Sequence, residues 1–532
     1  MSSITKQTVG NNTYLYESHS FRDEQGRPRN RKVKIGRIDR NTGRARYTPE
    51  YIDRMREAGT PVEIPQINQR EGLEEQLSEA LDSLKTYGLF YFLQKIGEKI
   101  KIIRILQQTL PAYWQEVWML CAYLIGCDKP LMYMEDWIEE HEGYQVGKMN
   151  SQRLSELLGA FGQKERNDFF KAWCAANISD EYMAVDITSI SSYSRLIPEC
   201  ERGYNRDGEN MEQINFCLLF GERTGLPVYQ AVYSGSIGDA ATLKATLAEV
   251  EAVSGGKRLI LVADKGFYSV KNVKMMLERY KGSEFLIAVP FANKWTMELI
   301  REERDGIDRI TNLIHTSGSP SRGVRRKIDF GGTPLTAHVL YDPERALGER
   351  NDRYNYVSWL KELVEAGKET VAYRKDIDNY LLVRKGSAGV ASAKIREDVL
   401  ESEIETAGWF VMLGNGKLTA QQAHDIYSKK DVIEKAFMKY KNQLGLKRLR
   451  VHTEQRMRNK LFVAFIALTV VSYIHRVMKE KGLYRKMTME KLFITLAKLK
   501  KVTINGRNIL RPLTKTQQDI FKAFSVPRPS VG

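Results

Sequence analysis

Cysteine is scarce in this sequence, with five residues among 532. They are odd in number and show no C-x2-C spacing: Cys121, Cys127, Cys174, Cys200 and Cys217. Reduced thiols are therefore expected instead of a disulfide framework. The N-terminus also shows no basic segment followed by an apolar one, so secretion is not expected and the protein is expected in the cytoplasm.

Long apolar runs are missing as well. The most apolar stretch, residues 461–474, is interrupted by Thr469 and Ser472 and is shorter than the ~20 residues that cross a bilayer. This stretch predicts a helix that is buried in the protein core.

Two common enzyme signatures are absent. The nearest approach to a phosphate-binding G-x4-G-K-[ST] loop is GNGKLT at residues 414–419, which lacks the first glycine at the required spacing. The seven histidines are scattered and form neither H-E-x-x-H nor a cluster with cysteine. Nucleoside triphosphate hydrolysis and zinc-dependent hydrolysis are therefore not supported.

Acidic residues are few in one part of the chain. The formal net charge is +16 and the pI is about 9.3. Residues 427–507 hold 21 Lys and Arg against 5 Asp and Glu, so this stretch accounts for the whole surplus and the remainder is balanced. A basic surplus so concentrated favours a polyanionic partner, nucleic acid before a membrane surface.

Hydrophobic periodicity divides the first 180 residues in two. Residues 1–66 predict a small strand-rich unit, with strands at TYLYES and RKVKIGRI around the polar turn DEQGRPR. Five of its cations stand close together: Arg27, Arg29, Arg31, Lys32 and Lys34. Residues 67–180 have helical periodicity. A purely structural cap on the core stays open for this helical region, because no clear helix-turn-helix is visible.

Residues 181–290 predict the first part of an α/β core. Apolar runs predict strands at 182–188, 214–220, 227–233, 258–264 and 284–290, and helical periodicity appears at 239–255 and 269–280. The resulting order, β-β-β-α-β-α-β, is that of a ribonuclease-H-like fold.

Two aspartates, Asp186 and Asp264, are expected to end apolar strands of this core. A carboxylate in such a place is exposed at a sheet edge but rigidly held, as a metal site requires. Asp239 is the main rival, and it ranks lower because an N-cap role at the following helix explains it fully.

Residues 408–480 predict the second part of the core. Within them, Leu418–Leu446 predicts one long helix, which Thr419 and Gln422 begin as a capping box and Gly445 ends. Four of its side chains share one narrow stripe beside an apolar arc: Tyr427, Lys430, Glu434 and Lys441. Taken alone, this stripe also fits an ordinary surface helix with i,i+4 ion pairs.

The spacing of these four residues, Y-x2-[R/K]-x3-E-x6-K, resembles the Y-x2-R-x3-E-x6-K signature of cut-and-paste DDE transposases of the insertion-sequence-4 type. Lys430 departs from the usual arginine, and an ammonium cannot hold a phosphate bidentately as a guanidinium does. Segments at 186–188 (DIT), 203–208 (GYNRDG), 235–239 (GSIGD) and 264–269 (DKGFYS) resemble the same family. The resemblance runs from about residue 150 to the C-terminus.

The resemblance implies a metal-dependent enzyme. Asp186, Asp264 and Glu434 would be the catalytic acids and would hold two Mg²⁺ or Mn²⁺ ions. The phosphates beside the scissile bond would be bound by three further side chains: Tyr427, Lys430 and Lys441. The partner would be double-stranded DNA, at terminal inverted repeats and at the target, bound by a homodimer at a prokaryotic nucleoid. By the same resemblance, the helical residues 67–180 would form a module that binds the DNA ends.

Two other functions stay open. One is a ribonuclease-H-like, metal-dependent nuclease without strand transfer. The other is a non-catalytic DNA-binding protein descended from a transposase, against which an intact set of three acids argues.

The long separation of Asp264 from Glu434 implies an insertion at residues 291–407, and strand-like pieces among polar turns predict that it is β-rich. By resemblance it would contact the DNA end and supply an aromatic side chain for a flipped base. Three tryptophans are candidates, although burial in the core is the commoner role of such a residue: Trp295, Trp359 and Trp409. Residues 481–532 predict C-terminal helices that either dimerise or lie along DNA.

Overall fold

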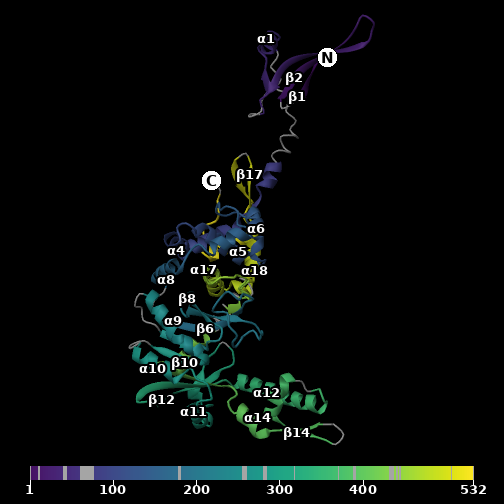
Figure 1. Ribbon diagram of the computed structural model, residues 1–532. Helices are drawn as coiled ribbons and strands as arrows, with labels where there is room; N and C mark the ends of the chain where they lie inside the picture. Colours follow the sequence, from purple (N-terminus) through teal and green to yellow (C-terminus); the bar gives the residue numbers. More distant parts are fainter. Residues whose placement is uncertain are drawn as a thin grey trace. The chain divides into compact units, whose positions relative to one another are not determined.

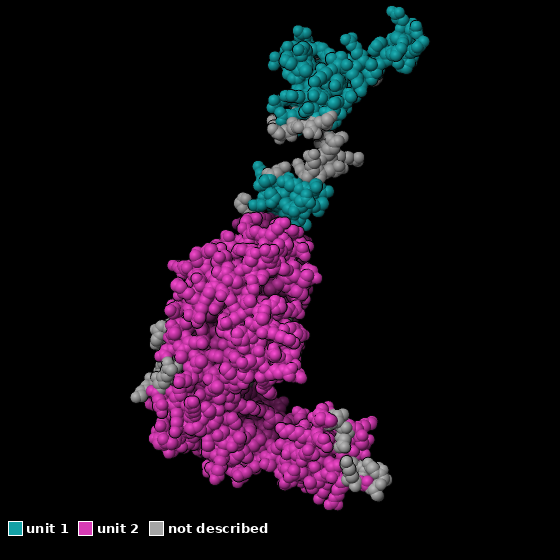
Figure 2. Space-filling model, viewed as in Figure 1, with its two compact units in different colours: residues 1–84, 502–509, 532 teal, residues 85–501, 510–531 magenta. Residues whose placement is uncertain are grey.

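The computed structural model forms two compact units (Figure 2). The first comprises residues 1–84, 502–509 and 532, and the second comprises residues 85–501 and 510–531. The structure describes residues 2–9, 12–39, 43, 45–59, 77–177, 181–254, 260–279, 284–316, 318–368, 371–386, 391–430, 437–438, 441, 445–504 and 506–530.

The first unit has, among its described residues, a four-stranded antiparallel sheet in the order β1-β2-β3-β4 (Figure 1). Its elements are β1 (Ser2–Val9), β2 (Asn12–Arg22), β3 (Pro28–Ile38), β4 (Ala45–Tyr47) and α1 (Pro49–Glu57). Leu15, Ile35 and Tyr51 form a small core between the sheet and the helix. The two predicted strands are confirmed as β2 and β3, whereas β1 and α1 are additional. The predicted end of this unit near residue 66 lies outside the described residues.

Helices from both ends of the chain pack together in the second unit. The earlier ones are α3 (Gly88–Lys99), α4 (Ile102–Thr109), α5 (Trp114–Gly126), α6 (Met134–Glu140), α7 (Ser151–Leu157) and α8 (Gln163–Asn177). The later ones are α17 (Glu454–Glu480), α18 (Met489–Ala497) and α19 (Lys515–Ala523). Because α17 contacts α3 and α5, and α18 contacts α3 and α19, they share one apolar core. The C-terminal region also contains β17 (Lys500–Ile504) and β18 (Arg507–Leu510), which the helical prediction does not include.

Helix α17 contains the most apolar stretch of the chain. Its length and composition would allow it to cross a membrane, but 89% of its most apolar window is buried inside the protein. Every residue of 461–474 is buried, which confirms the predicted core helix. Thr469 fits this environment because its hydroxyl donates a hydrogen bond to the carbonyl of Phe465, at 2.8 Å.

A large mixed sheet forms the centre of the second unit. Over the described residues it has nine strands in the order β11-β12-β13-β16-β10-β9-β6-β7-β8. The first group along the chain is β6 (Tyr182–Ser191), β7 (Gln213–Gly221), β8 (Pro227–Ser234), α9 (Asp239–Ser254), β9 (Ile260–Ala263), α10 (Val270–Arg279) and β10 (Phe285–Ala288). β9 pairs in parallel with β6 and β10, and the β7–β8 pair is an antiparallel hairpin. The α/β class and the predicted β-β-β-α-β-α-β order are confirmed.

The insertion is mixed, so the prediction that it is β-rich is wrong in part. β11 (Leu313–Ile314), β12 (Ser321–Phe330) and β13 (Thr333–Tyr341) extend the central sheet next to β16 (Trp409–Gly414). Helices supply much of the rest: α11 (Lys294–Arg304), α12 (Pro343–Glu365), α13 (Arg374–Tyr380) and α14 (Glu397–Ile404), beside the hairpin β14 (Leu381–Lys385) and β15 (Ala391–Ile395). Figure 1 shows α12, α14 and β14 gathered in one lobe, residues 343–407.

The lobe leaves and rejoins the sheet at adjacent points. Tyr341 and Trp409 face each other in the β13–β16 register, and the N–H of Asp342 donates to the carbonyl of Gly408 at 2.9 Å. Gly408 has a φ of 76°, and a Cβ there would lie 2.5 Å from the Asp342 carbonyl oxygen. Only glycine fits this closure without strain.

Candidate active site

The two predicted aspartates lie on neighbouring parallel strands. In the β6–β9 register, Val185 faces Ala263, so Asp186 and Asp264 follow at the next step of each strand. Asp264 ends β9 as expected, and its side chain accepts the N–H of Lys265 at 2.7 Å. Asp186 does not end its strand: it lies inside β6 and pairs with Leu218 of β7. What ends at Asp186 is the parallel pairing, because β9 stops there and β6 continues along β7.

Lys430 joins both acids. Its Nζ lies 3.2 Å from Oδ2 of Asp264 and 3.7 Å from Oδ2 of Asp186, and its side chain is only 4% exposed. The hydroxyl of Tyr427 donates to Oδ1 of Asp264 at 3.0 Å. Charges this close and this well shielded from water interact strongly. The four side chains therefore form one electrostatic unit.

The two carboxyl groups differ in acidity. Burial raises the pKa of Asp186 to about 6, against the opposing pull of Lys430 and with a further rise from the charge of Asp264. Burial also pushes the pKa of Asp264 upward, but Lys430, the N–H of Lys265 and the Tyr427 hydroxyl outweigh it, so this pKa is lowered. Two neighbouring acids whose pKa values shift in opposite directions and that share a charge partner are typical of functional sites.

A break in the predicted long helix delivers Lys430 to this place. The capping box of Thr419 and Gln422 is present, but α15 (Ala420–Ser428) ends at Ser428. The N–H of Lys430 then donates to the carbonyl of Tyr427 in a tight turn, at 2.9 Å. The prediction of one continuous helix through residue 446 is therefore wrong at this point, where the backbone forms a turn and the side chain of Lys430 contacts both acids.

The third predicted acid, Glu434, lies outside the described residues, as do residues 431–436, 439–440 and 442–444. Gly445 has a φ of 66°, the left-handed conformation expected of a helix stop. Among the residues that the structure does place, no three Asp, Glu, His or Cys side chains form a metal-sized group.

Asp186 and Asp264 nevertheless fit a divalent cation. Their Oδ2 atoms both lie within 4 Å of one ammonium, so they already converge on a positive charge. Carboxylate oxygens are the ligands that Mg²⁺ and Mn²⁺ prefer.

Lys441 has a protein partner in this structure. Its Nζ donates to Oδ1 and Oδ2 of Asp207, at 2.8 and 2.6 Å. Asp207 belongs to the GYNRDG segment, far from Lys441 in sequence. A carboxylate thus occupies the donors that a DNA phosphate would need.

Asp239 has a different role from the predicted N-cap. It is the first residue of α9, and Nη2 of Arg206 lies 2.6 Å from each of its carboxylate oxygens. A Cβ on Gly266 would lie 2.7 Å from its Oδ2, so Asp239 packs against the turn that follows Asp264. The charge of Arg206 also lowers the pKa of Asp186, but this effect is smaller than those of burial, Lys430 and Asp264. Sequence reasoning noted the GYNRDG segment but did not single out Arg206.

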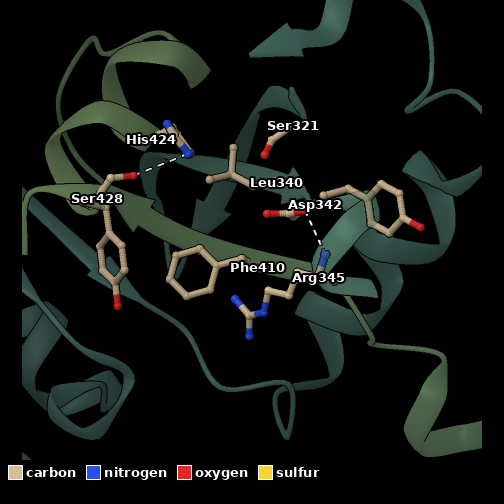
Figure 3. A pocket seen from close by; sticks show the side chains of 10 residues that line it. Ser321, Leu340, Asp342, Arg345, Phe410, His424 and Ser428 are labelled. Atoms are coloured by element: carbon tan, nitrogen blue, oxygen red, sulfur yellow. Dashed lines mark hydrogen bonds between the residues drawn. The ribbon is translucent and has the colours of Figure 1, made fainter. Parts of the chain in front are cut away.

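A cavity of about 150 Å³ lies beside Tyr427. Figure 3 shows its side chains, with a hydrogen bond between the Ser428 hydroxyl and Nε2 of His424 and the N–H of Arg345 donating to Asp342. The rings of Phe410 and Tyr427 lie 4.7 Å apart. The cavity is lined by Ser321, Leu340, Tyr341, Asp342, Arg345, Gly408, Phe410, His424, Tyr427 and Ser428.

The three candidate tryptophans differ in exposure. Trp409 is 3% exposed and packs on Tyr341, which is a core role. Trp295 is partly buried against the core. Trp359, on α12, is 40% exposed and stacks on Tyr356, so it has a ring face near solvent.

Comparison with known proteins identifies the family. No curated protein matches the chain. Among solved structures, the chain is similar to a piggyBac transposase in a cryo-EM synaptic complex with hairpin DNA, at 13% identity and a TM-score of 0.32; the match covers 66% of this chain and 59% of that one. A family model described as "Transposase DDE domain" matches residues 179–470, more than half of the chain and a range that includes Asp186, Asp264 and Lys430. The chain therefore belongs to the DDE-domain transposase family.

Proposed function

We propose that this chain is the transposase of an insertion sequence, which cleaves DNA at the ends of the element and joins those ends to target DNA. The observation that carries the proposal is the placement of Asp186 and Asp264 at the same step of two parallel strands, both facing Lys430. Family membership supplies the reaction class. The protein would act in the cytoplasm at the nucleoid, where its substrate lies.

DDE transposases generally use divalent metal ions. We assign Asp186, Asp264 and Glu434 as the residues that would hold two Mg²⁺ or Mn²⁺ ions. When bound, such ions activate the attacking oxygen and stabilise the leaving oxygen of a phosphodiester displacement.

The remaining residues position these groups. Tyr427 fixes one oxygen of Asp264 by its hydrogen bond, and the lowered pKa keeps that carboxylate ionised near neutral pH. Lys430 compensates the charge of both acids from within the protein. Once other cations neutralise the acids, its ammonium is available to a DNA phosphate as a point charge.

Lys441 would act similarly at a second phosphate. The side chain of Lys441 is 10% exposed and that of its present partner, Asp207, is 25% exposed, so DNA would reach the ammonium by displacing Asp207. A DNA phosphate and a carboxylate both accept from an ammonium, which makes such an exchange chemically simple.

The deciding experiment uses DNA that carries the element's ends, identified as short inverted repeats flanking the gene. The parent should yield both cleaved ends and products joined to a second DNA. Cleavage without joining would instead indicate a nuclease, and binding without cleavage a non-catalytic DNA-binding protein. A homodimer is expected in the complex with end DNA, and light scattering with and without that DNA measures it.

A further inference from the structure

The hairpin formed by β2 and β3 extends well beyond the core of the first unit. Leu15 and Ile35 are buried at its base, and Arg54 of α1 pairs with Glu17 next to them. Farther out, every residue of Pro28–Lys34 is exposed. A strand that served only the fold would normally bury one of its faces. On β2, Glu17 and Ser18 are buried whereas residues 20–22 are exposed. The outermost part of the hairpin therefore offers both faces to a partner, and farther in the exposed cations lie on β3.

The tip of the hairpin is preorganised. Oδ1 of Asp23 accepts the N–H groups of Gln25 and Arg27, at 3.1 and 2.9 Å, and its Oδ2 accepts Nε of Arg29 at 3.0 Å. Gly26 provides the turn with a φ of 75°. A tip that is already ordered loses little conformational entropy when it binds.

Cations lie on both faces of this ribbon. Arg29 and Arg31 stand opposite Phe21 and His19, and these side chains share one face. Lys32 and Lys34 stand opposite Ser18 and Tyr16 on the other face. Lys34 also lies over the ring of Tyr14, 4.0 Å from its centroid, which holds that ammonium near the strand.

We propose that the β2–β3 hairpin is a second DNA-binding element, which enters the major groove of duplex DNA tip first. Arg29 and Arg31 would face the phosphates of one strand, and Lys32 and Lys34 those of the other. The major groove is about 12 Å wide and admits a two-stranded β-ribbon. The hairpin is two-stranded beyond His19, where the described pairing of β2 with β1 ends. The choice of DNA rests on the proposed function.

Charge on both faces distinguishes this partner from a lipid surface. A bilayer surface is flat and would be met by one face of the ribbon, leaving the other pair of cations in water. A groove with a phosphate backbone on each side uses both pairs. Phosphate contacts of this kind carry no sequence information, so the hairpin should bind duplexes of any sequence.

The test uses the full-length chain and a fluorescent duplex of arbitrary sequence. Two double variants, Arg29→Gln/Arg31→Gln and Lys32→Gln/Lys34→Gln, each remove the two positive charges from one face of the hairpin. A matched control, Lys164→Gln/Lys515→Gln, removes two charges from exposed lysines of the second unit. Anisotropy titrations over a range of salt concentrations give the affinity and its salt dependence, and circular dichroism confirms that each variant is folded.

Each hairpin variant should weaken binding and reduce the slope of log affinity against log salt by about 1.8, because each phosphate contact contributes about 0.9. The control should change the slope by clearly less. Loss from one face only would mean that the ribbon lies flat, and would overturn tip-first entry. Unchanged slopes in both variants would overturn the inference altogether.

Two further outcomes separate this inference from the proposed function. If hairpin variants lose binding to anionic phospholipid vesicles and keep duplex binding, the partner is a membrane and the inference fails. If they lose duplex binding while the parent forms no cleaved or joined product from end DNA, the hairpin inference stands and the proposed function fails.

Discussion

The ammonium of Lys430 lies 3.2 Å from Oδ2 of Asp264, although Lys430 comes from a turn 166 positions later in the chain. Its side chain is almost fully buried, which excludes the solvated surface lysine that the helical stripe alone would allow. One ammonium therefore offsets part of the charge of two carboxylates from within the protein when the site holds no other cation. The contact between Lys430 and the two acids should therefore affect the melting temperature and the Mn²⁺ affinity of the protein, which can be measured without catalysis.

Substitution of any one of the three assigned acids should stop the chemistry. Asp186→Asn, Asp264→Asn and Glu434→Gln each remove a ligand charge with little change in volume, so cleavage and joining should be lost while end DNA is still bound. Asp329→Asn is the control, because Asp329 is exposed on β12 of the same sheet and accepts only a turn N–H. Single-turnover cleavage within about tenfold of the parent would disprove the assignment of that acid.

Lys430→Met should slow single-turnover cleavage by about 10- to 150-fold, the equivalent of a charge-assisted contact of ~1.5–3 kcal/mol. Lys430→Arg should keep or improve the rate, because a guanidinium can hold a phosphate through two donors. Lys429→Met is the matched control: it removes the same charge from an exposed neighbour that pairs with Glu222.

The same variant should alter the protein without DNA. Lys430→Met leaves two facing carboxylates without their counter-charge, so the melting temperature in chelator should fall and Mn²⁺ should restore it. Calorimetry should also show tighter Mn²⁺ binding than in the parent. If cleavage, melting temperature and Mn²⁺ affinity all match the parent, Lys430 has no role in this site.

Substitutions of Lys441 and Asp207, which pair with each other, should affect DNA binding differently. Lys441→Met should weaken DNA binding and lower the salt slope by about 0.9, the contribution of one phosphate. Asp207→Asn frees the ammonium and should leave binding equal or tighter. Equal losses of thermal stability in both variants, with unchanged DNA binding, would show that the pair is purely structural.

The buried Lys460 should make the free energy of unfolding depend on pH, and this effect does not involve the candidate active site. Burial lowers its pKa to about 8, with help from Arg450, although Nζ donates to the carbonyl of Leu449 at 2.7 Å. The unfolded lysine titrates near ~10.4, so the folded chain binds its proton less tightly. The contribution of Lys460 to stability is therefore present at high pH and is lost as the pH falls towards 8.

Urea unfolding of the parent and Lys460→Met measures this effect. Between pH 7 and pH 10, the difference in unfolding free energy should move by about 2–3 kcal/mol in favour of the parent. Lys479→Met, at an exposed position of the same helix, should show no such change. A constant difference across this range would mean that Lys460 titrates normally in the folded protein.

Local patterns predicted the strands and both described acids because each depends on a few neighbouring residues. The apolar runs that became β6 and β9 are short and clear, and Asp264 follows the second directly. Their register was not predictable, because it depends on pairing between distant segments. Asp186 was therefore expected at a strand end, when in fact only its parallel neighbour ends there.

The errors have the same origin in long-range contacts. Periodicity runs through Lys429 and Lys430 without interruption, so it indicates neither the end of α15 at Ser428 nor the contact of Lys430 with aspartates on distant strands. The sequence did not predict helix α12, because charged residues dominate its first half and its apolar stripe, Val357, Leu360 and Val364, is confined to the second. Asp342 and Pro343 nevertheless mark its start as an N-cap and first-turn proline. Arg206 and Asp239 likewise meet only in the folded chain.

The hydrogen bond between Asp342 and Gly408 brings the two ends of the lobe together, so the lobe can be replaced without moving the strands on either side. Tyr341 and Trp409 are already opposite each other, so a short turn between them would convert β13 and β16 into an ordinary hairpin. Related chains can thus gain, lose or exchange whatever lies at residues 343–407 without altering the strands that carry Asp186 and Asp264. Length differences among relatives should accumulate at this junction, and a grafted domain should be tolerated there better than at any bend next to the acids.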